Sequence, residues 1–420
     1  MSHRTHVAIV AAACVLPRLG ALLLERGNVL ADFTEKSDDF ARTFVESGTY
    51  GFLPGDPSAY TQPLYGFFLV PLYAVGGRHW LVVGLAQIAL ALATALLVYG
   101  LGRRYLSPTA GALAAVAATL SPYLVWHDVH VNREIVDQPL AVGIVFLALL
   151  LAERPRLVSA VALGAVCGLA ILGNARLAAV PLLVAAFVLV CWRGSIGRRE
   201  LGLAVVVVTA AALTVTPWIV RNSVSVGCAV ITTDARALWK ANNEQTYDLL
   251  ASGQWIDAVE GPPGAPPTPE EAFGIYREHG TRIPVDECEQ MRYYQELTED
   301  FLRKHPGEKV RLAAQAVGML WDPRSTQTEG RPGADGVRDT ARELAMPVYL
   351  LALLAVALPG LWLVPRRLAT LTLALLAYQT LTAMLFVGAT RYRVPWDFLL
   401  ALAGAATVIW LLEWFRSRRG

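Results

Sequence analysis

Long apolar runs separated by polar connections recur from one end of the chain to the other. A helical run of about 20 apolar residues crosses the roughly 30 Å of hydrocarbon in a bilayer, so each such run predicts a transmembrane helix. The pattern predicts about ten spans, of which the fifth and sixth are short and separated only by Gly173 and Asn174. The expected spans are residues 6–25, 80–101, 108–126, 135–152, 157–173, 176–192, 201–219, 346–364, 368–388 and 396–415.

The first polar interruption, residues 26–79, has a pattern of its own. Apolar positions repeat with helical spacing over residues 34–47, Asp32 stands near the start as a candidate cap, and Gly48 follows the last position. We expect this helix to lie at the membrane interface. Residues 63–74 form an apolar and aromatic segment that is too short to span, and we expect it to lie against the membrane.

The second interruption, residues 220–345, is long enough to form a separate portion of the molecule. Residues 261–269 are rich in Pro and Gly and are expected to form a loop. Helical patterns follow at residues 270–276, 288–304 and 306–321. The chain therefore divides into an N-terminal transmembrane region (1–219, with the first loop at 26–79), the portion 220–345 and C-terminal transmembrane helices (346–420).

Composition is typical of a polytopic membrane protein and unlike that of a soluble enzyme, since 55% of the 420 residues are hydrophobic and 17% are charged. Arginines concentrate on alternate connections, which predicts that these connections and both termini are cytoplasmic. They are Arg4, Arg103, Arg104, Arg154, Arg156, Arg193, Arg198, Arg199, Arg366, Arg367, Arg416, Arg418 and Arg419. The two polar portions then face outward. Because Arg18 interrupts the first span and no small-x-small site follows, we do not expect a cleavable signal peptide.

The five cysteines fall into two groups. Cys14, Cys167 and Cys191 lie in expected spans and are interpreted as small apolar packing residues. Cys228 and Cys288 lie in the outward portion, where oxidation is permitted, and the sequence fits both a disulfide and two free thiols. The chain has no zinc-type cysteine spacing, no internal repeat, no Gly-rich phosphate loop and no basic nucleic-acid stripe.

Four carboxylates of the first loop, Asp32, Glu35, Asp38 and Asp39, are the leading candidates for chemistry. They lie within about two helical turns of an expected membrane helix, where a carboxylate is costly, so they indicate a water-filled cavity. A solvated helix beside the membrane is the simpler alternative.

A second candidate group connects the third and fourth spans. It comprises two histidines and three carboxylates, a set that suits a divalent cation or an acceptor site: His127, Asp128, His130, Glu134 and Asp137. The alternative is a polar connection that caps the fourth helix. Glu134 begins that otherwise apolar helix and is the first to test. With Tyr60 of the first loop, His130 and Glu134 are our candidates for the acceptor side of the cavity.

Five arginines contradict the positive-inside pattern, because they stand at the outward ends of spans: Arg133, Arg176, Arg221, Arg391 and Arg393. Snorkelling accounts for some of them. An anionic headgroup at the outer leaflet accounts for the set better, since arginine offers bidentate geometry to phosphate.

Several motifs occur in an order that resembles the polyprenyl-phosphate-sugar-dependent glycosyltransferases of the GT-C fold. That group includes the dolichyl-phosphate-mannose protein mannosyltransferases, the lipid A aminoarabinose transferase and bacterial relatives. The motifs are the acidic first loop, Gly48-Thr49-Tyr50-Gly51-Phe52, residues 57–65 and 121–134, Gly168 to Arg176, Pro217-Trp218-Ile219-Val220-Arg221-Asn222, residues 238–243 and 301–306, Trp321-Asp322-Pro323 and Arg391-Tyr392-Arg393-Val394-Pro395. Their number and order carry the resemblance, which covers most of the chain.

The resemblance implies an all-α, polytopic GT-C bundle with a mostly helical outward portion. It implies a sugar donor on a polyprenyl phosphate and inverting transfer to a protein, glycolipid or polysaccharide acceptor, without a nucleotide. A carboxylate acts as the base, and Arg221, Arg391 and Arg393, with Arg176, would stabilise the leaving phosphate. The chain departs from the family in the register of its first-loop acid. Asp32 is favoured as the base, Asp38 is second, and Glu35 stays open.

Two other classes of function remain. A transporter or flippase for lipid-linked sugars also has many spans, although transporters commonly show inverted repeats and none is found in this sequence. A non-catalytic assembly subunit would tolerate the irregular first loop. Release of free polyprenyl phosphate from the donor distinguishes an enzyme from both.

Asp32→Asn is expected to abolish sugar transfer while the protein still folds and inserts, because an amide cannot accept the acceptor proton. The measurement is product formation from a lipid-phosphate sugar in liposomes. Full activity in this variant would move the base to Asp38 or Glu35.

Overall fold

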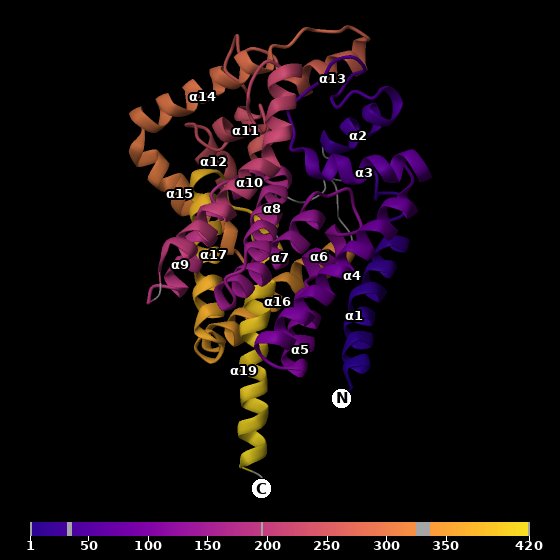
Figure 1. Ribbon diagram of the computed structural model, residues 1–420. Helices are drawn as coiled ribbons and strands as arrows, with labels where there is room; N and C mark the ends of the chain where they lie inside the picture. Colours follow the sequence, from indigo (N-terminus) through magenta and orange to yellow (C-terminus); the bar gives the residue numbers. More distant parts are fainter. Residues whose placement is uncertain (1, 32–35, 195, 325–336, 419–420) are drawn as a thin grey trace.

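The computed structural model of the protein describes residues 2–31, 36–194, 196–324 and 337–418. Within these ranges it is helical and contains no β-strand (Figure 1). The membrane-type helices are α1 (His3–Leu24), α4 (Trp80–Tyr105), α5 (Pro108–Thr119), α7 (Glu134–Glu153), α8 (Leu157–Gly173), α9 (Val180–Cys191), α10 (Arg198–Ser225), α16 (Val337–Leu363), α17 (Arg366–Leu385) and α19 (Phe398–Ser417). The other helices are α2 (Lys36–Ser47), α3 (Pro63–Gly76), α6 (Pro122–His127), α11 (Ala235–Lys240), α12 (Thr246–Ala251), α13 (Pro269–His279), α14 (Glu287–Lys304), α15 (Pro306–Trp321) and α18 (Thr390–Arg393).

Every expected span coincides with a helix, and seven helices of the described chain are long and apolar enough to cross a membrane. The protein is therefore a multi-pass membrane protein. The prediction for residues 108–126 was wrong in its extent, because α5 ends at Thr119 and α6 begins at Pro122. Proline has no N–H and favours the first turn of a helix, so it starts a new one. The span expected at 176–192 is shortened in the same way, because α9 begins at Val180 after a 3-10 turn.

The arginine-rich connections gather at one end of the bundle. Arg104 pairs with Glu153 at 2.7 Å, joining the last turns of α4 and α7. Arg199 donates to the Pro155 carbonyl and Arg367 to the Ala152 carbonyl, which brings the starts of α10 and α17 to the same place. Figure 1 shows both termini at this end and α13 and α14 at the opposite one, which we call the domain end.

Close helix packing relies on glycine where α8 crosses α10. A Cβ at Gly164 would lie 2.4 Å from the Val207 carbonyl oxygen, and one at Gly168 would lie 2.7 Å from that of Ala211. Small residues four positions apart let two membrane helices approach to backbone contact, where dispersion contributes most. This contact fixes the middle of α10, which leads from the bundle into the domain end.

The polar portions also follow the expected pattern. Gly48 ends α2 with a φ of 73°, a conformation that glycine adopts without strain. The helices expected within 270–321 are present as α13, α14 and α15, and Thr268 caps α13 together with Glu271 in a capping box. Cys228 and Cys288 form a disulfide with a Cα–Cα distance of 5.9 Å. It joins the segment after α10 to the first turn of α14.

A buried ion pair joins α1 to the α6–α7 connection. Arg18 and Asp128 are 1% and 0% exposed, and two guanidinium nitrogens of Arg18 donate to Oδ2 of Asp128 at 2.9 and 2.7 Å. The third nitrogen donates to the Cys14 and Thr119 carbonyls, and Gln138 donates to Oδ1 of Asp128 at 2.7 Å. A charge inside a membrane protein requires such partners.

Asp128→Leu is expected to lower the free energy of unfolding by about 3–5 kcal/mol, because it leaves the Arg18 guanidinium buried without a counter-charge. The double variant Arg18→Met/Asp128→Leu should lose much less, since neither charge remains. Reversible unfolding in mixed micelles measures both. Additive losses in the double variant would show that the two charges do not act as a pair.

Candidate active site

The first-loop carboxylate Asp38 is buried on the inner face of α2. Its Oδ1 accepts a 2.5 Å hydrogen bond from the Tyr73 hydroxyl, and Nη2 of Arg78 lies 2.8 Å from Oδ2. Arg78 Nε contacts both oxygens as well. Asp38 therefore anchors α2 to the connection between α3 and α4, and its carboxylate is occupied. Asp32 and Glu35 lie outside the described residues.

Asp39 has a different environment. It is half-buried on α2, and burial, followed by the adjacent negative charge of Asp38, raises the pKa of its carboxyl above the ordinary 3.8. Arg42 lies 3.6 Å away and lowers the pKa less than the other effects raise it. Among the carboxylates at the start of α2, Asp39 thus binds a proton more readily than a solvated aspartate.

Arginines at the domain end surround one carboxylate. Glu134, 5% exposed, starts α7, and its Oε1 lies 2.7 Å from Arg391 Nε and 3.8 Å from Arg133 Nε. The charges of Arg133, Arg391 and Glu134 also act on Arg176. Asp137, the next carboxylate on α7, accepts a hydrogen bond from Asn174. Three guanidinium groups thus lie around Glu134. We call Arg133, Arg176 and Arg391 with Glu134 the arginine cluster.

Aromatic rings hold the cluster in place. The Arg176 guanidinium lies 3.6 Å from the centre of the Tyr392 ring and 4.8 Å from that of Phe386, and it donates to the Val387 carbonyl at 3.2 Å. The rings fix the cation without neutralising it. Arg133 and Arg391 keep 17% and 26% of their side chains exposed, so both remain in contact with solvent.

Arg393, two residues after Arg391, lies apart from this cluster. It is 1% exposed, and its Nε pairs with Asp397 at 3.2 Å while Nη1 donates to the Leu320 carbonyl at 2.7 Å. These contacts join α18, α19 and α15. Because its charge is balanced and buried, we do not retain Arg393 among the proposed phosphate ligands.

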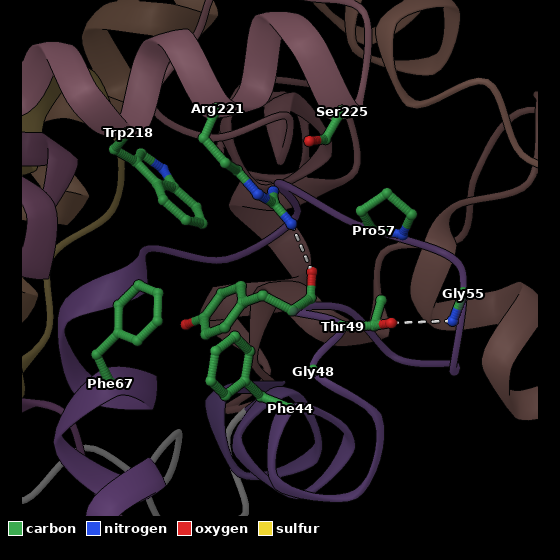
Figure 2. A pocket seen from close by; sticks show the side chains of 10 residues that line it. Phe44, Gly48, Thr49, Gly55, Pro57, Phe67, Trp218, Arg221 and Ser225 are labelled. Atoms are coloured by element: carbon green, nitrogen blue, oxygen red, sulfur yellow. Dashed lines mark hydrogen bonds between the residues drawn. The ribbon is translucent and has the colours of Figure 1, made fainter.

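Arg221 lines a separate cavity of about 400 Å³ between the first loop, α3 and α10 (Figure 2). Nη1 donates to the Ser58 carbonyl and Nη2 to the Tyr50 carbonyl, at 2.7 and 2.8 Å. Arg221 therefore holds both sides of the turn between Tyr50 and Ser58. Among the described contacts, none joins Arg221 to Arg133, Arg176 or Arg391.

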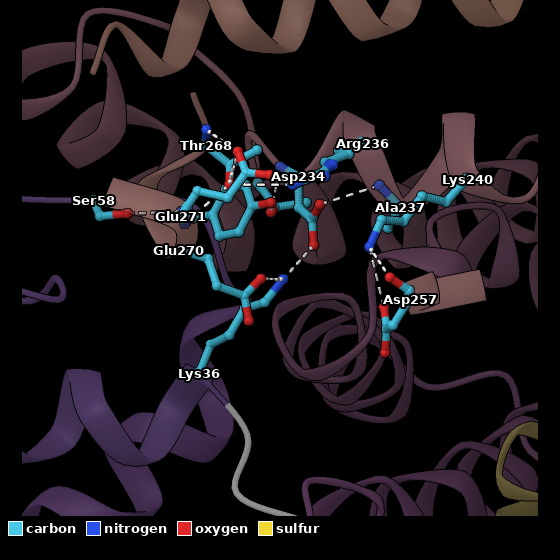
Figure 3. A network of polar contacts seen from close by, with 12 residues as sticks. Lys36, Ser58, Asp234, Arg236, Ala237, Lys240, Asp257, Thr268, Glu270 and Glu271 are labelled. Carbon is cyan, nitrogen blue, oxygen red and sulfur yellow. Dashed lines mark hydrogen bonds and ion pairs between the residues drawn. The ribbon is translucent and has the colours of Figure 1, made fainter. Parts of the chain in front are cut away.

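Tyr60 and His130 are both buried. Lys36 Nζ lies 4.2 Å from the centre of the Tyr60 ring and pairs with Asp234 and Glu270 at 3.0 and 3.2 Å (Figure 3). This network joins the first turn of α2 to the helices after α10. The His130 ring packs on Trp126 and its Nδ1 lies 2.8 Å from the Trp126 carbonyl oxygen. Both side chains therefore pack inside the protein beside the site, Tyr60 against Lys36 and His130 against Trp126.

A metal-binding set is not found among the described residues, in which no three His, Cys, Asp or Glu side chains gather. Of the segment 126–137, Asp128 is used by Arg18 and Glu134 by Arg391. Asp32 and Glu35 lie outside the described residues.

The sequence did not predict a role in the site for three of its residues. Arg78 and Tyr73 hold Asp38, and Gln62 accepts a hydrogen bond from Arg133 at 2.9 Å. An arginine in the short connection 77–79, beside an acidic loop, was a usable signal for Arg78. Nothing in the sequence indicates the role of Gln62, because its partner lies 71 positions away.

The arrangement of the helices is that of a known membrane fold. The chain resembles the archaeal oligosaccharyltransferase AglB from Archaeoglobus fulgidus in complex with an inhibitory peptide and a dolichol-phosphate, with a TM-score of 0.55 and 14% identity over 99% of this chain and 51% of that one. The apo form of the Archaeoglobus fulgidus oligosaccharyltransferase gives 0.53 at 13% identity over the same shares. The expected GT-C type bundle is thus confirmed as a fold, and the chain spans about half the length of these relatives.

The sequence comparison agrees with the fold. Residues 58–219 match the family model of dolichyl-phosphate-mannose-protein mannosyltransferase, so the expected resemblance is confirmed over this range. ArnT from Cupriavidus metallidurans bound to undecaprenyl phosphate is also similar, with a TM-score of 0.39 and 14% identity over 97% of this chain and 78% of that one. No curated protein matches the sequence.

Asp39→Asn is expected to stabilise the protein at pH 7 but not at pH 4. A carboxyl whose pKa is raised on folding contributes stability at low pH and loses it as pH rises through that pKa. The asparagine variant lacks this titration, so its melting temperature in detergent should exceed that of the wild type only at the higher pH. An equal difference at both pH values would contradict the raised pKa.

Proposed function

We propose that the protein is an integral-membrane glycosyltransferase. It moves a sugar from a polyprenyl-phosphate donor to an acceptor at the outer face of the membrane, with both termini in the cytoplasm. Three findings support this proposal: the fold shared with an oligosaccharyltransferase, the family match over residues 58–219 and the arginine cluster at the domain end. A lipid-linked donor needs no nucleotide site.

The arginine cluster is the observation that carries the proposal. Arg133, Arg176 and Arg391 approach one another at the ends of membrane helices, where like charges repel. Glu134 lies 2.7 Å from Arg391 and 3.8 Å from Arg133. An anion of the size of a phosphate relieves the remaining repulsion, and guanidinium groups match its oxygens in bidentate geometry.

The chemistry assigned to this site is a single displacement. The acceptor oxygen forms a bond to the anomeric carbon while the bond from that carbon to the phosphate oxygen breaks, and its electron pair stays on the phosphate. The arginine cluster stabilises the negative charge that develops on this leaving group, so the leaving group needs no proton from the protein. The acceptor proton passes to a carboxylate, which also stabilises positive charge at the anomeric carbon.

The identity of the catalytic base is a proposal that rests on the resemblance. We keep Asp32 in this role, although it lies outside the described residues. Asp38 suits the role less well, since its carboxylate is bound by Arg78 and Tyr73. Glu134 is bound by Arg391 and is assigned to placing that arginine. The divalent cation suggested by the sequence of residues 126–137 stays a prediction.

Arg391→Gln is expected to weaken the apparent affinity for the donor about tenfold or more, because it removes a charged hydrogen-bond donor from the phosphate. Arg391→Lys should retain part of the affinity, since it keeps the charge but not the planar fork. The measurement is polyprenyl-phosphate release against donor concentration in liposomes. Arg303→Gln, an exposed arginine of α14, is the matched control. Unchanged donor affinity in Arg391→Gln would remove Arg391 from the phosphate site.

A further inference from the structure

The cavity beside Arg221 lies at the boundary between the membrane helices and the domain end. Its walls come from the first loop, from Phe67 of α3 and from the last turns of α10 (Figure 2). On α10, a helix of membrane-spanning type, the side chains of Val220 and Val224 are 54% and 82% exposed in the last two turns. Phe67 is 42% exposed beside the cavity. The cavity therefore lies beside an exposed apolar surface, which suits a ligand that carries a lipid chain.

The walls of the cavity combine aromatic rings with a few polar groups. Phe44, Tyr50, Phe67 and Trp218 supply the rings. Figure 2 shows Phe44 and Phe67 below the Arg221 side chain and Trp218 beside it. Polar groups at the rim are the Thr49 and Ser225 hydroxyls and the Arg221 guanidinium. Such a wall suits a sugar ring, whose C–H face packs on aromatic side chains while its hydroxyls meet polar groups at the edge.

This cavity is preformed. The Tyr50 ring stacks on Phe67 and meets Trp218 edge-on, with ring centres 4.7 and 5.4 Å apart. Gly66 leaves room for the Tyr50 hydroxyl, which would lie 2.2 Å from a Cβ at that position. Arg221 holds the backbone on both sides of the turn. A ligand thus binds without first ordering these side chains, which lowers the entropic cost of binding.

Gln62 and Pro63 connect the cavity to the arginine cluster. The hydroxyl of Tyr50, which lines the cavity, donates to the Pro63 carbonyl at 3.2 Å. Arg133 of the cluster donates to the Gln62 side chain at 2.9 Å. Because Gln62 and Pro63 are consecutive residues whose Cα atoms are about 3.8 Å apart, one stretch of backbone contacts both sites.

We propose that this cavity binds the sugar head of a lipid-borne saccharide that approaches from the bilayer between α3 and α10. Its role as the acceptor of the transferred sugar rests on the proposed function; the binding itself does not. The acceptor class is then a glycolipid rather than a protein. The exposed valines of α10 contact the lipid chain, Phe67 and Trp218 contact the sugar ring, and Arg221 and Ser225 face its hydroxyls.

Photolabelling of the full chain in phosphatidylcholine nanodiscs tests the binding. The probe is a dodecyl glucoside with a diazirine in its chain, and the matched probe carries a phosphocholine head on the same chain. The glucoside is expected to label the Pro63–Gly76 and Arg198–Ser225 helices at the domain end, whereas the phosphocholine probe labels all lipid-facing helices alike. Preferential labelling of these two helices at the domain end by the phosphocholine probe, or equal labelling by both probes, would overturn the proposal.

Variants make the test specific. Phe67→Ala should lower glucoside labelling of this place about tenfold, since it removes the most exposed ring of the cavity wall. Trp218→Phe should lower it less, because a smaller ring remains. Trp362→Ala, which removes an 83% exposed ring of α16, is the control and should change nothing. Labelling that Phe67→Ala leaves unchanged would contradict the site.

Donor turnover separates this inference from the proposed function. In the transfer reaction, the apparent KM for a lipid-borne saccharide should rise in Phe67→Ala. If wild-type protein is labelled specifically but does not turn over the donor, the proposed glycosyltransferase function is wrong and the proposed binding site stands. If it turns over the donor without specific labelling, the proposed binding site is wrong and the proposed function stands.

Discussion

Charged side chains among membrane helices need partners from the protein itself, because hydrocarbon offers none. The Arg18–Asp128 pair meets this requirement fully, with every nitrogen of the guanidinium engaged between α1, the end of α5 and the α6–α7 connection. It fixes the point from which α7 starts, and with it the position of Glu134. The arginine cluster depends on that position. The functional surface at the domain end is thus built on a charge pair deeper in the bundle.

The contrast between Arg393 and Arg391 shows what this constraint implies for function. Arg393 has a carboxylate and a carbonyl, is excluded from water and joins three helices. Arg391 shares one carboxylate with Arg133, remains partly exposed and lies within electrostatic range of Arg176. A buried and paired cation stabilises structure, whereas several cations that keep contact with solvent suit the anionic ligand that we propose.

Hydropathy predicted where the helices lie, because a membrane helix depends on local composition. It did not predict what the polar side chains contact. Arg18 appears in the sequence only as an interruption of an apolar run, and its partner lies 110 positions away. The sequence places Arg391 and Arg393 at the same expected outward end of a span, yet Arg391 pairs with Glu134 and Arg393 pairs with Asp397. Side-chain direction around a short helix depends on tertiary packing, so the sequence alone grouped them together.

The Cys228–Cys288 disulfide has a consequence for biogenesis. A disulfide forms in an oxidising compartment, so with the outward orientation that we propose the covalent link between the end of α10 and the start of α14 arises only after this segment has been translocated. In that orientation, insertion of the helices precedes the last step of maturation. Newly synthesised molecules then pass through a stage in which the bundle is assembled but α10 and α14 are not yet joined covalently.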